Sequence, residues 1–152
     1  MFYCRSNKLS SSIPPEIGKL VNLEDVTLRD NNLSGKIPPE IGKLIKLMYL
    51  YLYGNELSGK IPSEIGNLIN LRELYLNDNE LIDAILKSLL NLQKLTALNI
   101  RHNHLYTNDA ELRNFLSSKQ IGGDWENFQT PYFTEKNAKP WIPLLLLDDY
   151  VR

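Results

Sequence analysis

Residues 47–68 read LMYLYLYGNELSGKIPSEIGNL, and this stretch decides the fold. Its triplet LYL at 50–52 alternates apolar with aromatic residues, which is the period of a half-buried strand. Asn55 ends that strand. The segment at 58–62 then bends the chain back, because its proline cannot continue an α-helix. Residues 64–68 have the length of one short helical or 3-10 turn. The stretch therefore predicts one coil of strand, bend and short return.

The same pattern recurs every 24 residues. An asparagine marks each unit, and a leucine follows it two residues later. The five asparagines are Asn7, Asn31, Asn55, Asn79 and Asn103. One unit offers about seven or eight apolar side chains, each worth ~1.5–3 kcal/mol when buried. Ordering its backbone costs ~1–2 kcal/mol per residue, so a lone unit is unstable and the units must stack.

The recurring asparagine has a specific role in such a stack. Its amide carries two donors and an acceptor with two lone pairs. Inside the turn, it can satisfy backbone groups that no strand partner reaches. Repeated once per coil, the five side chains predict a hydrogen-bonded ladder.

The consensus L-x-x-L-x-L-x-x-N-x-L-S-G-x-I-P-x-x-I-G-x-L resembles the plant-specific class of leucine-rich repeats. Residues 47–68 match it at every fixed position, and residues 23–44 match with one change, Val26. The resemblance covers about residues 2–116. It implies a right-handed α/β solenoid, with a concave parallel sheet of about five strands and short helical or 3-10 turns outside. Members of this family act by binding, as receptor ectodomains, enzyme inhibitors and adhesion surfaces.

After the repeats come HLYT at 104–107, ELRNFL at 111–116 and GGDWENFQT at 122–130. Together these segments resemble the closing cap of bacterial surface leucine-rich-repeat proteins. Asn108 and Glu111 have the spacing of a capping box that opens a helix. Three apolar residues of that helix share one face, and Trp125 is placed to cover the last coil. The three residues are Leu112, Phe115 and Leu116. We therefore expect five repeats over 1–106, the first truncated, a cap over 107–130, and a tail over 131–152 to which no structure is assigned.

Two repeats depart from the consensus. The first begins mid-motif, with Phe2 and Cys4 at leucine positions, and predicts an apolar edge open to solvent. The fourth lacks the glycines and the proline over 83–90. Its outer segment is expected to be more helical, with Asp83 as a candidate N-cap.

Composition narrows the choice of partners. The chain has 17 basic and 18 acidic residues, and this balance favours neither nucleic acid nor an anionic membrane. The longest apolar run, at 141–147, is far shorter than the ~18–20 residues that span a bilayer. The family resemblance implies a cell-surface or secreted location, although residues 1–12 lack the features of a secretory signal.

Strand residues that the core does not use should face outward together on the concave side. They form columns, one through Thr27 and Asn99 and a second through Arg29 and Arg101. The candidate binding residues are Tyr49, Tyr51, Tyr53, Tyr75, Arg29, Asn77 and Arg101. Tyrosine and arginine are enriched in binding hot spots. The alternative is that tyrosine merely suits a strand.

Catalytic and metal-binding patterns are not found. His102 and His104 flank the ladder residue Asn103, which sends them to different environments, and there is no further histidine to complete a zinc site. The sequence contains no phosphate loop and no G-x-S-x-G motif. We expect neither enzyme activity nor a cofactor.

Three functional hypotheses follow. The first is a module that binds a protein or peptide ligand on its concave face. The second is a self-associating unit that pairs through its open N-terminal edge or its apolar tail. The third is a fragment of a receptor-kinase ectodomain.

Overall fold

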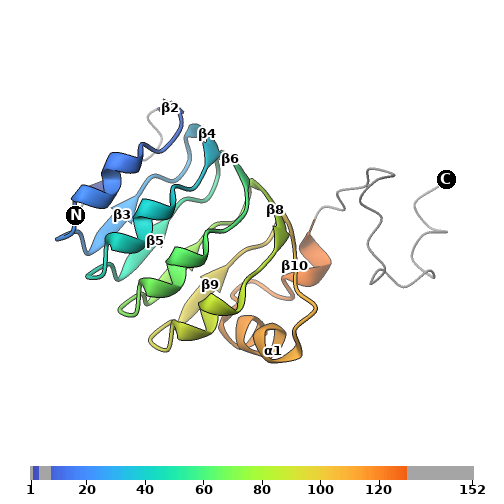
Figure 1. Cartoon of the computed structure of the whole chain (residues 1–152). Helices are drawn as coiled ribbons and strands as arrows, with labels where there is room; N and C mark the ends of the chain where they lie inside the picture. The colour runs from blue at the N-terminus through green and yellow to red at the C-terminus, as the bar shows by residue number, and fades with distance from the viewer. Residues whose placement is uncertain (1, 4–7, 130–152) are drawn as a thin grey trace, which may run out of the picture.

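The structure is a computed structural model that describes residues 2–3 and 8–129. It is a solenoid whose coils stack side by side (Figure 1). The concave sheet is parallel and consists, in spatial order, of β1 (Phe2–Tyr3), β3 (Asp25–Thr27), β5 (Tyr49–Tyr51), β7 (Glu73–Tyr75) and β9 (Ala97–Asn99). The predicted α/β solenoid with five concave strands is confirmed.

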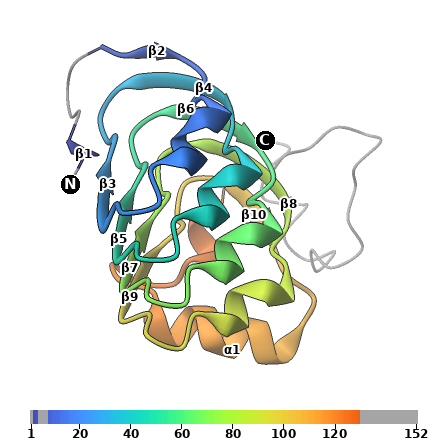
Figure 2. The ribbon, with the colours of Figure 1, turned by 60° about the vertical axis from the view of Figure 1, so that its left-hand side comes forward.

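A second parallel sheet follows the asparagine turns, and the sequence did not predict it. Its strands are β2 (Ser10–Ser11), β4 (Asn32–Lys36), β6 (Glu56–Gly59), β8 (Glu80–Ala84) and β10 (His104–Tyr106). Figure 2 shows the two sheets and the row of 3-10 helices as separate faces of the coil. These strands include serine, glycine and lysine, so they lack the apolar alternation that identifies a strand in sequence.

The outer face carries one 3-10 helix per coil. These helices are η1 (Pro15–Lys19), η2 (Pro39–Lys43), η3 (Ser63–Asn67) and η4 (Lys87–Asn91). The coils approach one another closely at the glycines of η1 to η3. A Cβ atom at Gly42 would lie 2.4 Å from the backbone oxygen of Glu64, and one at Gly66 would lie 2.3 Å from that of Ser88. Glycine is therefore required there for close stacking.

The prediction of a more helical fourth repeat is wrong. η4 is a five-residue 3-10 helix like its neighbours, and Leu86 is the residue that precedes it. Asp83 is not an N-cap but lies in β8, with φ +81°, at the position that Gly35 and Gly59 occupy in earlier coils. η4 packs against η3 and has the 3-10 form although the proline is missing.

Four ladder asparagines, Asn31, Asn55, Asn79 and Asn103, are buried. Asn55 is representative. Its side-chain oxygen accepts from the backbone N–H of Leu33 in the preceding coil at 3.0 Å, and its amide donates to the carbonyls of Leu28 (3.1 Å) and Leu52 (3.0 Å). Each side chain therefore ties its own turn to the coil before it. Asn7 lies outside the described residues.

The downstream end of the solenoid is covered by α1 (Ala110–Lys119) and the 3-10 helix η5 (Glu126–Phe128). Leu112, Leu116 and Trp125 are fully buried against the last coil, and Phe115 packs partly against the core. The expected helix and its apolar face are confirmed.

The N-cap of α1 is Asp109 rather than Asn108, which corrects the predicted capping box. The Asp109 carboxylate accepts from the backbone N–H of Leu112 at 2.8 Å. The carboxylate also pairs with the Lys87 ammonium at 2.7 Å. The contact with Lys87, and to a smaller extent the bond from Leu112, lowers the pKa of the Asp109 carboxyl below its usual value. The division into repeats, cap and tail remains a prediction, and the tail at 131–152 lies outside the described residues.

Candidate binding surface

The concave sheet brings the four predicted tyrosines together. Parallel pairing places Tyr49 beside Glu73 and Tyr51 beside Tyr75. The ring centroids of Tyr51 and Tyr75 lie 5.1 Å apart, those of Tyr49 and Tyr51 6.4 Å, and those of Tyr53 and Tyr75 6.3 Å. All four side chains are half-buried, so each ring is both packed and accessible. Tilted rings at these separations support one another, and the four form one aromatic patch.

Glu73 interacts with two tyrosines of this patch. The Tyr51 hydroxyl donates to the Glu73 carboxylate at 2.9 Å. Burial, followed by the hydrogen bond to Glu73 and its negative charge, raises the pKa of Tyr51 well above its usual value. Burial and then the charge of Glu73 raise the pKa of Tyr75 as well. Both shifts favour the neutral form of these phenols.

Arg29 borders the patch on its upstream side. Its guanidinium donates to the Tyr53 hydroxyl and lies 5.4 Å from the centre of that ring. The Asp30 carboxylate lies 3.8 Å from the same guanidinium, and the pKa of Arg29 is raised mainly by the hydrogen bond to Tyr53. Arg29 is thus held in place beside the tyrosines while remaining half-buried.

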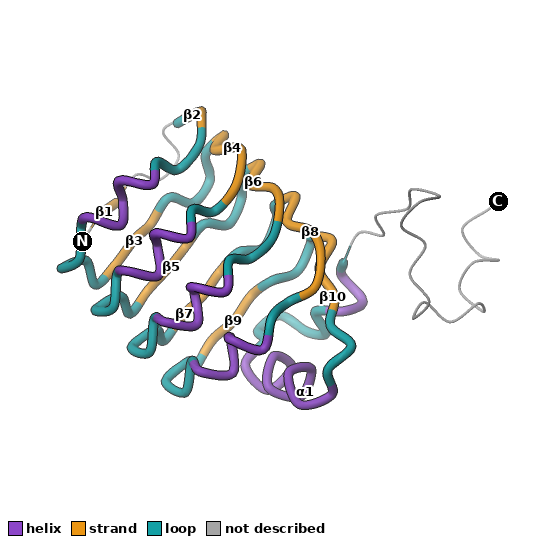
Figure 3. Tube along the Cα trace, viewed as in Figure 1, coloured by secondary structure: helices purple, strands orange, loops and turns teal. Residues whose placement is uncertain are grey.

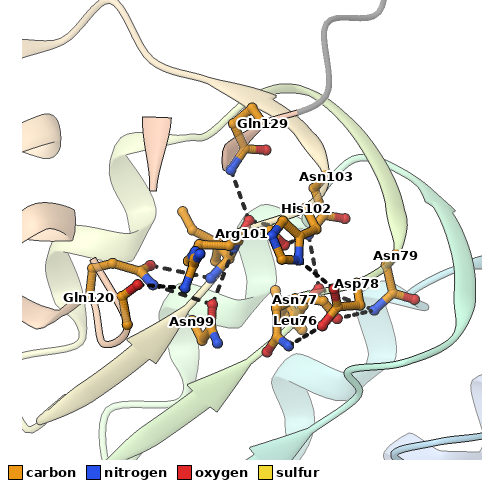
Figure 4. A network of polar contacts seen from close by, with 12 residues as sticks. Leu76, Asn77, Asp78, Asn79, Asn99, Arg101, His102, Asn103, Gln120 and Gln129 are labelled. Atoms are coloured by element: carbon orange, nitrogen blue, oxygen red, sulfur yellow. Dashed lines mark hydrogen bonds and ion pairs between the residues drawn. The ribbon is translucent and has the colours of Figure 1, made fainter. Parts of the chain in front are cut away.

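Arg101, the downstream member of the same column, is in a different situation. Its guanidinium lies 3.7 Å from the ring centre of Phe128 in η5 and donates to the backbone oxygen of Gly122. Figure 4 shows Arg101 within a polar network that also includes Asn99 and Gln120. The Arg101 side chain is therefore engaged by residues of the cap. Nothing near Arg101 in the sequence indicated this contact, because Phe128 is distant in the chain.

The other residues of the predicted columns are also less exposed than the strand pattern suggests. Thr27 is buried, and its hydroxyl donates to Asp25 at 3.0 Å, so it is not the exposed residue that the strand pattern predicted. The Asn77 amide donates to Asp78 at 2.6 Å. The Asn77 side-chain oxygen and the Arg101 Nε are buried without a hydrogen-bond partner among the described residues.

The two histidines lie in different surroundings, as the sequence predicted. His102 is exposed, contacts the Asp78 carboxylate at 2.5 Å and meets the Phe128 ring edge-on at 5.7 Å. His104 is half-buried in β10. In the part of the chain that the structure describes, no group of three or more histidine, cysteine or acidic residues could hold a metal ion.

The helices of the solenoid and its cap are short. Among residues 2–3 and 8–129, no helix is long and apolar enough to cross a bilayer.

Comparison with known proteins decides the family. A model described as a leucine-rich repeat region matches residues 4–120. The chain belongs to the leucine-rich repeat family. No curated protein sequence matches it.

Solved leucine-rich repeat structures are similar to this chain. The ectodomain of the Arabidopsis receptor kinase HAESA, in complex with an IDA peptide hormone, is 31% identical with a TM-score of 0.72, over 76% of this chain and 20% of that one. A chain of the BIR3–SERK2 complex from Arabidopsis thaliana is 34% identical with a TM-score of 0.70. The match covers 78% of this chain and 64% of that one. A leucine-rich repeat protein of Leptospira interrogans is 37% identical with a TM-score of 0.62. The match covers 76% of this chain and 28% of that one. The chain thus spans less than two thirds of each.

Proposed function

We propose that this leucine-rich repeat chain is a non-catalytic interaction module that binds a protein or peptide ligand on its concave face. The aromatic patch of Tyr49, Tyr51, Tyr53 and Tyr75 is the observation that carries the proposal. Large aromatic side chains held on a rigid sheet offer contact area at low conformational cost. The peptide and protein complexes formed by similar ectodomains support a ligand of this class.

The footprint of the ligand follows from which positions of the concave face are accessible. Arg29 and the tyrosines supply an accessible surface over β3, β5 and β7, whereas Arg101 is engaged by Phe128. We therefore place the ligand over the middle coils, with Asn77 at its downstream limit. Arg101 contributes to the cap and not to the ligand.

Selection from random peptides tests this proposal. A displayed random-peptide library is selected on the wild-type chain, and enriched peptides are titrated against the double variant Tyr51→Ser, Tyr75→Ser. We expect binding to be lost while circular dichroism and urea unfolding show a folded variant. Tyr106→Ser, in β10 of the second sheet, is the matched control. Enriched peptides that bind the double variant as well as the wild type contradict the proposal.

Self-association through the N-terminal edge is a second candidate. The edge carries an apolar pocket of about 410 Å³, lined by residues that include Leu9, Ile13 and Leu20, and Leu9 and Leu20 are exposed. Another coil stacked on this edge would bury these side chains. Light scattering tests this candidate, since a monomer at high concentration contradicts it. The receptor-ectodomain hypothesis predicts a membrane span and a kinase encoded downstream.

A further inference from the structure

A second exposed surface lies away from the aromatic patch, on the turns that connect each 3-10 helix to the next concave strand. In Figure 3 these turns are the row of loops between each purple helix and β3, β5, β7 or β9. Each turn carries an exposed residue directly after a leucine. The first three are apolar, with exposed fractions of 46% for Val21, 56% for Ile45 and 58% for Ile69. We call these three residues the lateral ridge.

Hydrogen bonds tie the turns that carry the ridge residues to one another. Lys46 donates to the Asn22 side chain at 2.8 Å, and Asn70 donates to the backbone oxygen of Ile45 at 2.9 Å. The backbone N–H of Met48 donates to Glu24, and that of Arg72 donates to Met48, each at 2.8 Å. Neighbouring turns are therefore about one strand spacing, ~5 Å, apart. The three residues of the lateral ridge therefore lie on turns that are hydrogen-bonded to one another.

The fold does not require apolar residues at these positions. Gln93 occupies the equivalent position in the next turn, which keeps the same backbone bonds: Leu95 N–H donates to Leu92, and Thr96 N–H donates to Arg72. A polar residue therefore forms this turn equally well. Three exposed aliphatic side chains in a row need another explanation, and contact with a partner provides one.

The charge around the lateral ridge is one-sided. Residues 19–24, 43–48, 67–72 and 91–96 contain five cations and a single carboxylate, Glu24, and all six side chains are exposed. The cations are Lys19, Lys43, Lys46, Arg72 and Lys94. None of them forms an ion pair within the described part of the chain. The whole chain has a net charge of −1, so these segments are more positive than the chain as a whole.

We infer that the lateral ridge docks an acidic amphipathic helix of a partner protein. An α-helix advances ~5.4 Å per turn, which matches the ~5 Å step between coils, so a helix along the stack presents one apolar residue to each ridge residue. Carboxylates beside its apolar stripe then face the lysines. An anionic membrane is disfavoured, because the net charge of the chain is negative and the ridge is only one side chain wide.

Peptide binding tests this inference independently of the concave face. The probes are a synthetic helix with a leucine stripe flanked by glutamates, and the same helix with lysines in place of the glutamates. We expect only the acidic helix to bind, more weakly as salt rises. Ile45→Gln and Ile69→Gln each lower the affinity about tenfold, because each removes one buried aliphatic contact. Gln93→Ile lengthens the ridge and tightens binding.

Controls separate this docking surface from other exposed apolar residues and from the aromatic patch. Leu86→Gln replaces another exposed apolar residue, 41% accessible and outside the ridge, and leaves binding unchanged. The double variant Tyr51→Ser, Tyr75→Ser also binds the acidic helix normally. The inference is overturned if the lysine helix binds equally well, if the glutamine variants keep full affinity, or if anionic vesicles bind the chain and the acidic helix does not.

Discussion

Tyr53 and Arg101 occupy the same position of the repeat, two coils apart, yet their surroundings differ. Tyr53 lies in the middle of the solenoid, where its ring contacts Tyr75 and the Arg29 guanidinium. Arg101 lies in the last coil, where the cap residue Phe128 covers it. A position that faces the concave side is therefore available to a ligand only where no cap packs on it. In the proposed binding mode the middle coils contact the ligand, whereas the last coil packs against the cap.

The largest effect is expected from breaking the cap. Trp125 is fully buried against the last coil, and Trp125→Ala should lower the free energy of unfolding by ~3–5 kcal/mol through the cavity that it leaves. Urea unfolding followed by circular dichroism measures the loss. Phe128→Ala, at a ring that is 42% exposed, should cost less. Equal effects of the two variants would show that the cap is not held by Trp125.

The asparagine ladder should give the next largest effect, in the middle of the stack. Asn55→Ala leaves the Leu33 N–H and the Leu28 and Leu52 carbonyls without this partner, at a cost of roughly 3 kcal/mol. Asn67→Ala, at an exposed position in η3, is the control and should change stability by less than about 0.5 kcal/mol. A loss of stability in Asn55→Ala as small as that of the control would mean that the ladder does not tie the coils together.

Different effects on peptide binding are expected for the two members of the shared column. Tyr53→Ala should weaken the binding of a library-selected peptide about tenfold and also cost about 1 kcal/mol of stability, through the lost contacts with Arg29 and Tyr75. Arg101→Ala should leave peptide affinity unchanged and cost about 1 kcal/mol of stability, through the lost contacts with Phe128 and Gly122. Isothermal titration and urea unfolding on both variants provide the comparison. If Arg101→Ala lowers the affinity for the peptide, the ligand extends over the last coil.

The smallest expected effect is the dependence of stability on pH through Tyr51. The raised pKa of Tyr51 means that the folded chain holds this proton more tightly than the unfolded chain, whose phenols titrate near ~10. The contribution to stability is complete below pH ~10 and falls as pH rises above it. Phenolate absorbance should show Tyr51 titrating above the ordinary range of a tyrosine, and titration in the ordinary range would contradict the raised pKa. Glu73→Gln removes the nearby charge and should bring its titration closer to the ordinary value.

The repeat made the core predictable, because each leucine column is fixed by the 24-residue period. The fully buried Leu50, Leu74 and Leu98 follow from that spacing alone. The neighbouring tyrosines also follow from it, because equal positions in successive coils must lie side by side. Periodicity therefore supplied both the fold and the composition of the aromatic patch.

Features that depend on contacts between different parts of the chain were not predictable in this way. Asp83 was misassigned because its left-handed backbone is set by its place in β8, where it accepts from the Ala84 N–H at 2.7 Å. The N-cap was placed one residue early, because Asn108 and Asp109 are both good capping residues. The engagement of Arg101 depends on where the cap folds, which no local pattern near Arg101 contains.

Mapping a library-selected peptide onto the labelled chain by backbone NMR tests the central claim most directly. We predict chemical-shift changes concentrated over Tyr49–Tyr51, Tyr53 and Glu73–Tyr75, fading toward Arg101. Changes concentrated instead on the 3-10 helices or on the second sheet would contradict a binding site on the concave face.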